Sequence, residues 1–312
     1  MLNCALKQAE TVAIGGHIRP DGDCFGSCMG LYQYIKSVYP NIKVDVYLEP
    51  VPECFHMFPV AKEILHEVKD VVYDLFISLD CASVDRLGFS QCLFDRAKKT
   101  LCVDHHISNS GFASENYIVP EASSASELVY HLIDKTAITT EVAECLYLGI
   151  VHDTGVFQYS STSPETMEAA AELMRRNVRA SEIIDNTYYE KTYVQNLMLG
   201  KALQESCLLL EGKVIASHIT RETMDANHIK PSDLEGIVSQ LRVTKGVEVA
   251  IFMYELEKNE FKVSLRASGD INVSKVAQFF GGGGHVKAAG LTMKGTSQEI
   301  TDKLLEQIQT QL

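Results

Sequence analysis

Four short polar segments, each following an apolar run of the chain, constrain this sequence more than any other feature. In order they are His17-x-x-x-Asp21-x-Asp23, Asp80, Asp104-His105-His106 and His152-Asp153-Thr154-Gly155. Parallel strands end at one edge of their sheet, where ligands gather, so the four segments are predicted to meet there. Carboxylates and imidazoles together suit manganese, magnesium, iron or zinc. Two such ions side by side are a common apparatus for hydrolysing phosphate esters.

The joint pattern carries this prediction, because each fragment alone says little. A lone Asp-x-Asp is usually a polar turn, and Asp80 alone could cap a helix. The four carboxylates that would converge belong to Asp21, Asp23, Asp80 and Asp153. Two like charges about 4 Å apart repel by roughly 4 kcal/mol at an effective dielectric of ~20, and two divalent cations would balance all four. With neutral nitrogen ligands from His17 and His105, the mixture favours manganese and leaves iron and zinc open.

Strand-like and helix-like segments alternate through the first half of the chain. The predicted strands cover residues 11–14, 43–48, 71–79 and 100–103. The predicted helices cover residues 25–39, 125–133, 142–151 and 164–176. This alternation indicates an α/β domain with a parallel sheet flanked by helices.

The second half of the chain changes character after a polar helical stretch at residues 181–205. Short strands are predicted at residues 207–210, 214–218, 247–254 and 261–266, and helices at 233–241, 273–280 and 298–312. We therefore expect a larger metal-binding domain at residues 1–185, a helical linker at 186–205 and a smaller α/β domain at 206–312.

Composition restricts the kind of substrate that the protein can bind and the cellular compartment in which it is expected. Long nucleic acids are usually held by many Lys and Arg contacts, so a net charge of −13 favours a short substrate. No apolar stretch approaches the roughly 18 residues of a membrane span, and the first residues lack a signal-peptide pattern. The nine cysteines contain no Cys-x-x-Cys, and Cys24 and Cys28 suit small buried positions better than a zinc pair. These features predict a reduced, cytoplasmic protein without a membrane segment.

The four polar segments together resemble the motifs of the DHH phosphoesterase family. Near the other end, Gly281-Gly282-Gly283-Gly284-His285-x-x-Ala288-Ala289-Gly290 resembles the signature of the DHH-associated C-terminal domain. The resemblance runs from about residue 11 to residue 291, nearly the whole chain. Within the family it is greatest to the short, stand-alone nanoRNases that also dephosphorylate pAp, which is adenosine carrying two phosphates on different ribose carbons.

The resemblance implies a role for each motif residue. One metal would be bound by His17 and Asp21, and the other by Asp23, His105 and Asp153, with Asp80 bridging both and a water between the metals as nucleophile. His106 would face the phosphate as a general acid or electrostatic stabiliser. Asp104 would orient a histidine, with a structural cap at the strand end as the equal alternative. The catalytic set is therefore His106, Asp80 and Asp104.

The smaller domain is implied to hold the nucleotide. Gly283 and Gly284 would let the backbone approach a phosphate, His285 would add a donor, and Arg266 would bind phosphate through two parallel hydrogen bonds. Arg86, six residues after Asp80, is a candidate for contacting the leaving phosphate, with a plain surface residue as the alternative.

The implied activity is hydrolysis of short oligoribonucleotides to mononucleotides and of pAp to AMP. A phosphodiesterase of cyclic di-AMP or of its linear product pApA is the nearest alternative. An inorganic pyrophosphatase or exopolyphosphatase would not need the glycine–histidine segment, and a catalytically inactive nucleotide-binding regulator would usually lack a metal ligand. Long nucleic acids and membranes are not expected as partners, and assembly as a homodimer stays open.

Overall fold

The computed structural model describes residues 1–312, which divide into unit 1, Met1–Glu190, and unit 2, Lys191–Leu312. Unit 1 contains a six-stranded sheet in the order β3-β2-β1-β4-β5-β6, and all five strand pairs are parallel. Its strands are β1 Thr11–Gly15, β2 Lys43–Tyr47, β3 Ile64–Leu65, β4 Leu75–Leu79, β5 Lys99–Asp104 and β6 Glu115–Ile118. The predicted parallel α/β architecture is confirmed.

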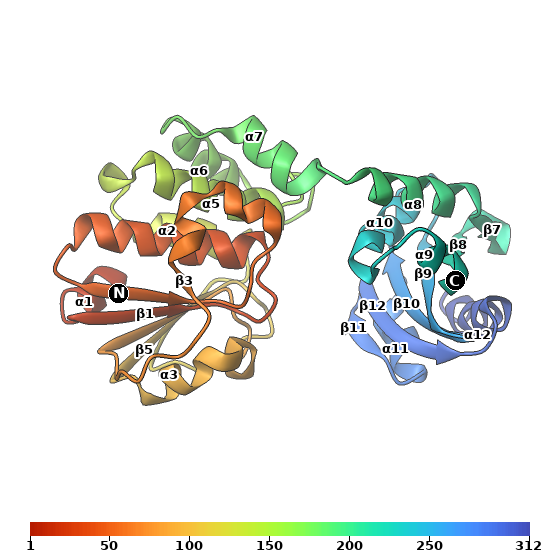
Figure 1. Cartoon of the computed structure of the whole chain (residues 1–312), viewed down its shortest axis with the longest axis horizontal. Helices are drawn as coiled ribbons and strands as arrows, with labels where there is room; N and C mark the ends of the chain where they lie inside the picture. Colours follow the sequence, from red (N-terminus) through yellow and green to blue (C-terminus); the bar gives the residue numbers. More distant parts are fainter. The chain divides into compact units, whose positions relative to one another are not determined.

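Helices cover both faces of this sheet. They are α1 Leu2–Leu6, α2 Gly22–Val38, α3 Gln91–Arg96, α4 Ala125–Leu132, α5 Thr140–Asp153, α6 Pro164–Met174 and α7 Ala180–Ile184, with short turns η1 Glu53–Met57, η2 Pro59–Glu63, η3 Val84–Ser90, η4 Lys135–Ala137 and η5 Asp185–Tyr189. Figure 1 shows α2 and α5 over one face and α3 over the other. Because both faces are covered, central strands such as β4 are buried at every residue and read as continuous apolar runs.

The strand predicted at residues 71–79 is shorter in the structure. Only β4, Leu75–Leu79, pairs with β1 and β5, while Val71 and Val72 precede it and are exposed. Pairing begins where Leu75 meets Val12 on one side and Lys99 on the other. The apolar run therefore begins before the sheet does, because Val71 and Val72 pair with no neighbouring strand.

The strand order reverses between β1 and β4. The chain first moves outward from β1 to β3 and then returns to β4 on the other side of β1 before continuing to β6. In open parallel sheets, the crevice at such a reversal is the usual place for a ligand. The carboxyl ends of β1, β4 and β5 therefore define the edge at which the polar motifs meet.

Helices α2 and α5 approach each other through glycines. A Cβ on Gly26 would lie 2.4 Å from the Cys145 backbone oxygen, and one on Gly30 would lie 2.7 Å from Leu146 Cδ2. On α5, a Cβ on Gly149 would lie 2.7 Å from Asp23 Oδ1 of α2 and 2.0 Å from Ser126 Oγ of α4. The separation of packed helices depends on the side chains at the contact, so these glycines permit an unusually close approach.

Unit 2 is a second, smaller α/β unit with a mixed sheet in the order β11-β12-β10-β9-β8-β7, in which only β8 and β9 are parallel. Its strands are β7 Cys207–Leu209, β8 Val214–Ile219, β9 Val249–Glu257, β10 Glu260–Ala267, β11 Gly283–His285 and β12 Ala288–Lys294. Its helices are α8 Tyr193–Gln204, α9 Arg221–Ala226, α10 Ile237–Arg242, α11 Val273–Phe279 and α12 Ser297–Gln309, with turns η6 Leu210–Gly212 and η7 Pro231–Leu234.

The stretch predicted as a continuous helical connection is divided between the two units. Residues 185–189 form a π-helical turn of unit 1, and α8 begins at Tyr193 after a break. Met198 and Ala202 of α8 are buried in a core with residues of β8, β9 and α10. The mostly polar sequence of α8 did not predict this packing, because only two of its twelve residues are fully buried.

Unit 2 also contains strands that the sequence pattern did not predict. β12 and β11 form a hairpin next to β10, and the glycine run enters that hairpin. A Cβ on Gly284 would lie 2.4 Å from the Ala288 backbone oxygen, and one on Gly282 would lie 2.5 Å from that of Gly290. Close strand packing thus requires two of the glycines, whereas a Cβ on Gly283 would meet open space.

The helices of both units differ from membrane-spanning helices in length, in apolar character or in both. None of them combines the length and the apolar character needed to cross a membrane.

The glycine contact between α2 and α5 leads to a stability prediction. Gly26→Ala should lower the unfolding free energy of unit 1 by about 1–3 kcal/mol, because a side chain must be forced against the α5 backbone. Gly200→Ala is the control, since nothing lies within 4 Å of a Cβ there and an exposed helical glycine gains about 0.5–1 kcal/mol from the change. Scanning calorimetry of both variants measures the effects, and equal shifts would contradict the close-packing account.

Candidate metal centre

The polar motifs lie where β1, β4 and β5 end. His17 follows β1, Asp80 follows β4, and Asp104 is the last residue of β5, directly before His105 and His106. Except for the two partly exposed histidines, these residues are buried.

Helices α2 and α5 supply the remaining carboxylates. Asp21 is the N-cap of α2 and accepts hydrogen bonds from the backbone N–H groups of Asp23 and Cys24, each at 3.1 Å. Asp23 lies in the first turn of α2, and Asp153 is the last residue of α5. The close approach of α2 and α5 therefore brings these carboxylates to the sheet edge.

Asp80 is the centre of the cluster. Its Oδ2 lies 3.4 Å from His17 Nε2, and its Oδ1 lies 3.5 Å from His105 Nε2 and 3.7 Å from His106 Nδ1. The residue has a φ of 52°, in the left-handed region that Asp tolerates better than most residues. A strained backbone held in place by its surroundings is common at functional sites, and here it turns the carboxylate toward three histidines.

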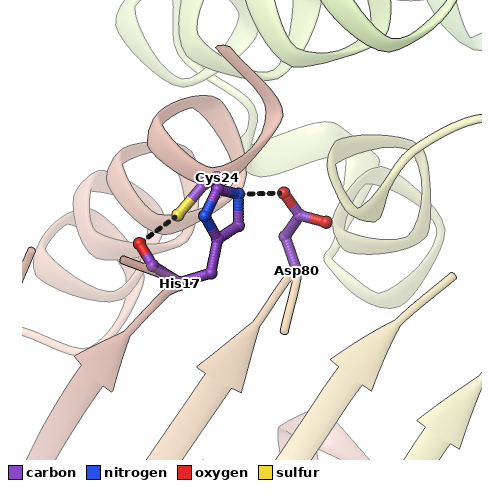
Figure 2. Close-up of side chains that lie close together, drawn as sticks. All are labelled: His17, Cys24 and Asp80. Atoms are coloured by element: carbon purple, nitrogen blue, oxygen red, sulfur yellow. Dashed lines mark hydrogen bonds and ion pairs between the residues drawn. The ribbon is translucent and has the colours of Figure 1, made fainter. Parts of the chain in front are cut away.

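His17 is held so that Nε2 faces the carboxylates. Its Nδ1 bonds the Ile18 carbonyl at 2.8 Å, and Nε2 lies 3.6 Å from Asp21 Oδ1. Figure 2 shows His17 between Asp80 and Cys24, whose thiol donates to the His17 carbonyl at 3.8 Å. The Cys24 sulfur and one ligand atom each of His17 and Asp80 lie within 4.8 Å of one another. Burial raises the pKa of the Cys24 thiol, which favours its neutral, protonated form.

A second group of donors faces the other side of Asp80. His105 Nε2 lies 3.1 Å from Asp153 Oδ2 and 3.9 Å from Asp23 Oδ2. His105 Nδ1 is 3.3 Å from the Ala122 carbonyl, which orients Nε2 toward the two carboxylates. Donor atoms of Asp23, His105 and Asp153 lie within 4.8 Å of one another, so this group could also hold a metal ion.

Asp23 has an additional role that the sequence did not reveal. Its Oδ2 accepts from Ala125 N at 2.6 Å and its Oδ1 accepts from Ser126 N at 2.8 Å, so it binds the N-terminus of α4. The positive end of a helix stabilises a buried carboxylate there. These bonds join residues about a hundred positions apart, and no local pattern could have indicated them.

His106 differs from the other two histidines because its near partner is Asp104. His106 Nδ1 lies 2.8 Å from Asp104 Oδ1, while Asp104 Oδ2 accepts from Asn109 Nδ2 at 2.7 Å. The hydrogen bond with Asp104 raises the pKa of His106. Asn109 also donates to the Cys81 carbonyl, so it holds Asp104 from a position that no motif marked.

The protonation of the cluster reflects its excess of negative charge. Burial lowers the pKa of His17 and of His105, but the carboxylates around each ring outweigh burial and raise both pKa values to about 12. Burial raises the pKa of Asp23 and of Asp153. For Asp80, burial acts upward but the two histidines outweigh it and lower the pKa. Protons thus neutralise a donor set whose oxygen and imidazole atoms fit divalent cations.

Two further residues border the cluster. The Arg86 carbonyl accepts from Ile18 N at 2.7 Å, and the Arg86 Nε atom is buried without a hydrogen-bond partner. His152 packs its ring against Phe55 and Tyr188, and burial lowers its pKa to about 4. His152 is therefore neutral beside the acidic cluster, and its motif position alone did not indicate this.

In unit 2, the sheet register aligns two residues predicted to bind substrate. Arg266 of β10 pairs with Ala288 of β12, which pairs with His285 of β11. Directly opposed residues of an antiparallel pair point to the same face of the sheet. Arg266 and His285 therefore lie on one face, separated only by the small side chain of Ala288, and Gly284 is next to His285 on the edge strand.

A parallel α/β sheet with carboxylates and imidazoles gathered at its point of reversal is the arrangement expected of a metal-dependent phosphoesterase. Comparison with known families agrees. The description "DHH family, N-terminal domain" matches residues 11–150, and "DHHA1 domain" matches residues 211–312. The chain belongs to the DHH phosphoesterase family, and it is a hydrolase acting on phosphate esters.

Similar proteins cover almost the whole chain. The protein named bifunctional oligoribonuclease and PAP phosphatase NrnA of Thermus thermophilus is 29% identical, covering 98% of this chain and 92% of the relative. The protein of the same name from Bacillus subtilis is 25% identical, covering 96% and 94%. A crystal structure of an exopolyphosphatase-related protein from Bacteroides fragilis superimposes with a TM-score of 0.90 at 26% identity, covering 99% and 94%.

The charge balance of the cluster predicts how metal binding depends on pH. A histidine whose pKa is raised on folding stabilises the protein fully below its unfolded pKa and loses that contribution as pH rises toward the folded pKa. For His17 and His105 the stabilisation is lost between pH 6.5, the ordinary pKa of histidine, and about pH 12, the raised pKa in the folded protein. One such histidine changes the free energy of unfolding by about 1.4 kcal/mol per pH unit, which corresponds to roughly 3–6 °C in Tm.

Metal-free protein should therefore melt at a lower temperature at about pH 8.5 than at about pH 6.5. Metal binds the deprotonated ligands, so the rise in Tm on adding Mn²⁺ should grow over the same interval. Thermal melts with chelator and with Mn²⁺ at both pH values measure the two effects. A metal-induced rise that stays constant or shrinks with pH would contradict this account.

Proposed function

We propose that this phosphoesterase degrades very short RNA fragments to mononucleotides and removes a phosphate from pAp to give AMP. The observation that carries the proposal is the presence, in one chain, of a buried carboxylate–imidazole cluster and a sheet face with Arg266 and His285 in register. The first feature suits phosphate-ester hydrolysis and the second suits recognition of a nucleotide phosphate. Relatives named for oligoribonuclease and PAP phosphatase activities span nearly the same length.

The metal-dependent chemistry of the family fits two divalent cations here, and we propose manganese. His17 and Asp21 would hold the first, Asp23, His105 and Asp153 the second, and Asp80 both. The bound cations would activate water and neutralise phosphate oxygens. The mixed oxygen and nitrogen donors support manganese over magnesium, which prefers oxygen ligands alone.

The residues around the cations would position the substrate and move a proton. We assign His106 as the general acid, because its raised pKa keeps the ring protonated and its Nδ1 is occupied by Asp104. Its Nε2 would then give the proton to the leaving oxygen. Asp104 is a positioning residue held by Asn109. The buried, unpartnered Nε of Arg86 supports a phosphate contact.

In unit 2, we assign Arg266 and His285 as phosphate ligands, with the backbone of Gly283 and Gly284 beside them. Arg266 would supply paired N–H donors to phosphate oxygens. The exposed position of residues 283–285 and the open space above Gly283 leave the backbone accessible. Unit 2 would thus bind the nucleotide that unit 1 hydrolyses.

Charge supports a short substrate. At a net charge of −13, each phosphate beyond the cations and the Arg266–His285 face meets a repulsive protein field. A cyclic dinucleotide presents no terminal phosphate to that face, so cyclic di-AMP should be a poorer substrate, and it and pApA are the alternative to be tested. Nine cysteines without a disulfide support a cytoplasmic location, and a homodimer is compatible with the same chemistry.

The role of His106 predicts a pH effect. Asp104→Asn removes the carboxylate that raises the His106 pKa, so the alkaline limb of the kcat–pH profile should move to lower pH. His106→Ala should lower kcat by roughly 10²-fold or more, the scale of lost acid–base catalysis. Metal content, measured by mass spectrometry, should be unchanged in both variants. An unmoved alkaline limb in Asp104→Asn would reject His106 as the acid.

The substrate proposal is tested by competition at fixed salt. RNAs of about two to five nucleotides should give the highest kcat/KM, with a steep fall toward a twenty-nucleotide RNA, because the acidic surface repels additional phosphates. pAp should be hydrolysed and cyclic di-AMP should react more slowly. Preference for the long RNA would overturn the short-substrate proposal, and preference for cyclic di-AMP or pApA would favour the alternative.

A further inference from the structure

Unit 2 contains a cavity beside Arg266 that the proposed phosphate contacts do not explain. Its volume is about 460 Å³, and it lies between one face of the sheet and the segment from η7 to α10. Its polar lining comes from Ser232, Glu235, Tyr254, Lys262, Ser264 and Arg266. The cavity therefore combines a cation at the phosphate-binding position with an aromatic ring, a second cation and a carboxylate.

The sheet register fixes the layout of this cavity. Lys262, Ser264 and Arg266 alternate along β10 and are half-buried, while the residues between them point into the opposite core. Lys262 and Arg266 are four residues apart, or roughly 13 Å at ~3.3 Å per residue. Tyr254 of β9 pairs directly with Lys262 and shares its face. One end of the cavity thus carries Arg266, and the other carries Tyr254 and Lys262.

Glu235 and Lys262 both line this cavity, and they do not form an ion pair with each other. Neither side chain makes an ion pair or a hydrogen bond, although Lys213 and Lys294 of the same unit pair with Glu248 and Glu260. Glu235 is close enough to Tyr254 to raise its pKa further, after the larger effect of burial. A donor and an acceptor therefore line the same cavity as one aromatic ring.

The chemistry of this end matches the edge of a nucleobase. Bases of single-stranded RNA are typically bound by stacking on an aromatic ring and by hydrogen bonds to their edges. Lysine donates to O6 or N7 of guanine, and a carboxylate accepts from N–H groups of a base. Guanine presents O6 next to N1–H and N2–H, so it offers both kinds of partner on adjacent atoms. Uracil has only one N–H on its edge and no amino group.

We propose that this cavity is a nucleobase pocket, in which a base stacks on Tyr254 and presents its edge to Lys262 and Glu235 while its phosphate meets Arg266. The pocket prefers guanine. This inference rests on the proposed function, because it identifies which part of a short RNA unit 2 recognises. Lys262, Glu235 and Tyr254 thereby determine base specificity and take no part in the bond cleavage.

The test compares the dinucleotides pGpG, pIpI, pApA and pUpU on the full-length, Mn²⁺-loaded protein. The wild type should show a kcat/KM for pGpG about tenfold above that for pUpU, with pIpI between them because inosine lacks the amino group. Glu235→Gln should reduce the preference for guanine over inosine to about twofold or less, and Lys262→Gln should lower kcat/KM for pGpG about tenfold. Glu257→Gln and Lys258→Gln, exposed charges of the β9–β10 hairpin, are the matched controls and should leave the order unchanged.

Stacking is tested separately by binding. Tyr254→Leu should weaken the affinity of a dinucleotide carrying the fluorescent base 2-aminopurine by about tenfold, whereas Tyr254→Phe should retain it, since stacking needs only the ring. Chelated protein allows this titration without turnover. Hydrolysis of bis-p-nitrophenyl phosphate, which has no base, should be the same in both Tyr254 variants, which verifies that they fold.

The outcomes separate the two proposals. Wild-type protein that cleaves none of the four dinucleotides and no pAp refutes the proposed function. Efficient cleavage without a preference for guanine, or a preference that survives Glu235→Gln and Lys262→Gln, refutes the pocket and leaves the proposed function intact. Equal binding losses in Tyr254→Leu and Tyr254→Phe would refute stacking.

Discussion

Repulsion among carboxylates gathered in one small volume is the constraint on which the rest of this structure depends. Asp80 is buried between His17 and His105, and Asp23 is fully buried against the N-terminus of α4. Such a group of charges is stable only with positive partners. In the metal-free protein, protons on the histidines and helix N–H groups supply them, and the same donor atoms are those that divalent cations prefer. Metal dependence is thus a consequence of how the chain folds.

The scaffold meets this constraint by combining a sheet edge with two closely packed helices. Parallel strands deliver His17, Asp80 and His105 to one edge, while α2 and α5 bring Asp23 and Asp153 from above. Glycines on both helices permit the short separation, and a side chain at Gly149 would lie 2.7 Å from Asp23 Oδ1. Packing and chemistry are therefore coupled, since the contact that stabilises the α2–α5 pair also sets the position of a carboxylate of the site.

Unit 2 contains a mixed sheet that places polar side chains in rows. Antiparallel pairing places Arg266, Ala288 and His285 in a row, and alternation along β10 places Lys262 on the same face. The opposite face is occupied by an apolar core beneath α11 and α12. On the face that carries Lys262 and Arg266, α8 and α10 pack over β8 and β9, so the polar side chains of β10 lie beside a second apolar core. The parallel sheet of unit 1 instead gathers buried carboxylates and imidazoles at its edge.

The sequence by itself determined the class of fold and the family, and it predicted a metal site from the four polar motifs, because apolar runs followed by Asp and His are local patterns. Local periodicity misjudged residues 71–74 and concealed the packing of α8, since pairing partners and buried faces are set by neighbours in space. Only the tertiary structure decided that Asn109 holds Asp104, that Asp23 binds α4 across 102 positions, and that Glu235 and Lys262 share a cavity. Each of these contacts joins segments whose separation along the chain carries no periodic signal, so their position follows from packing alone.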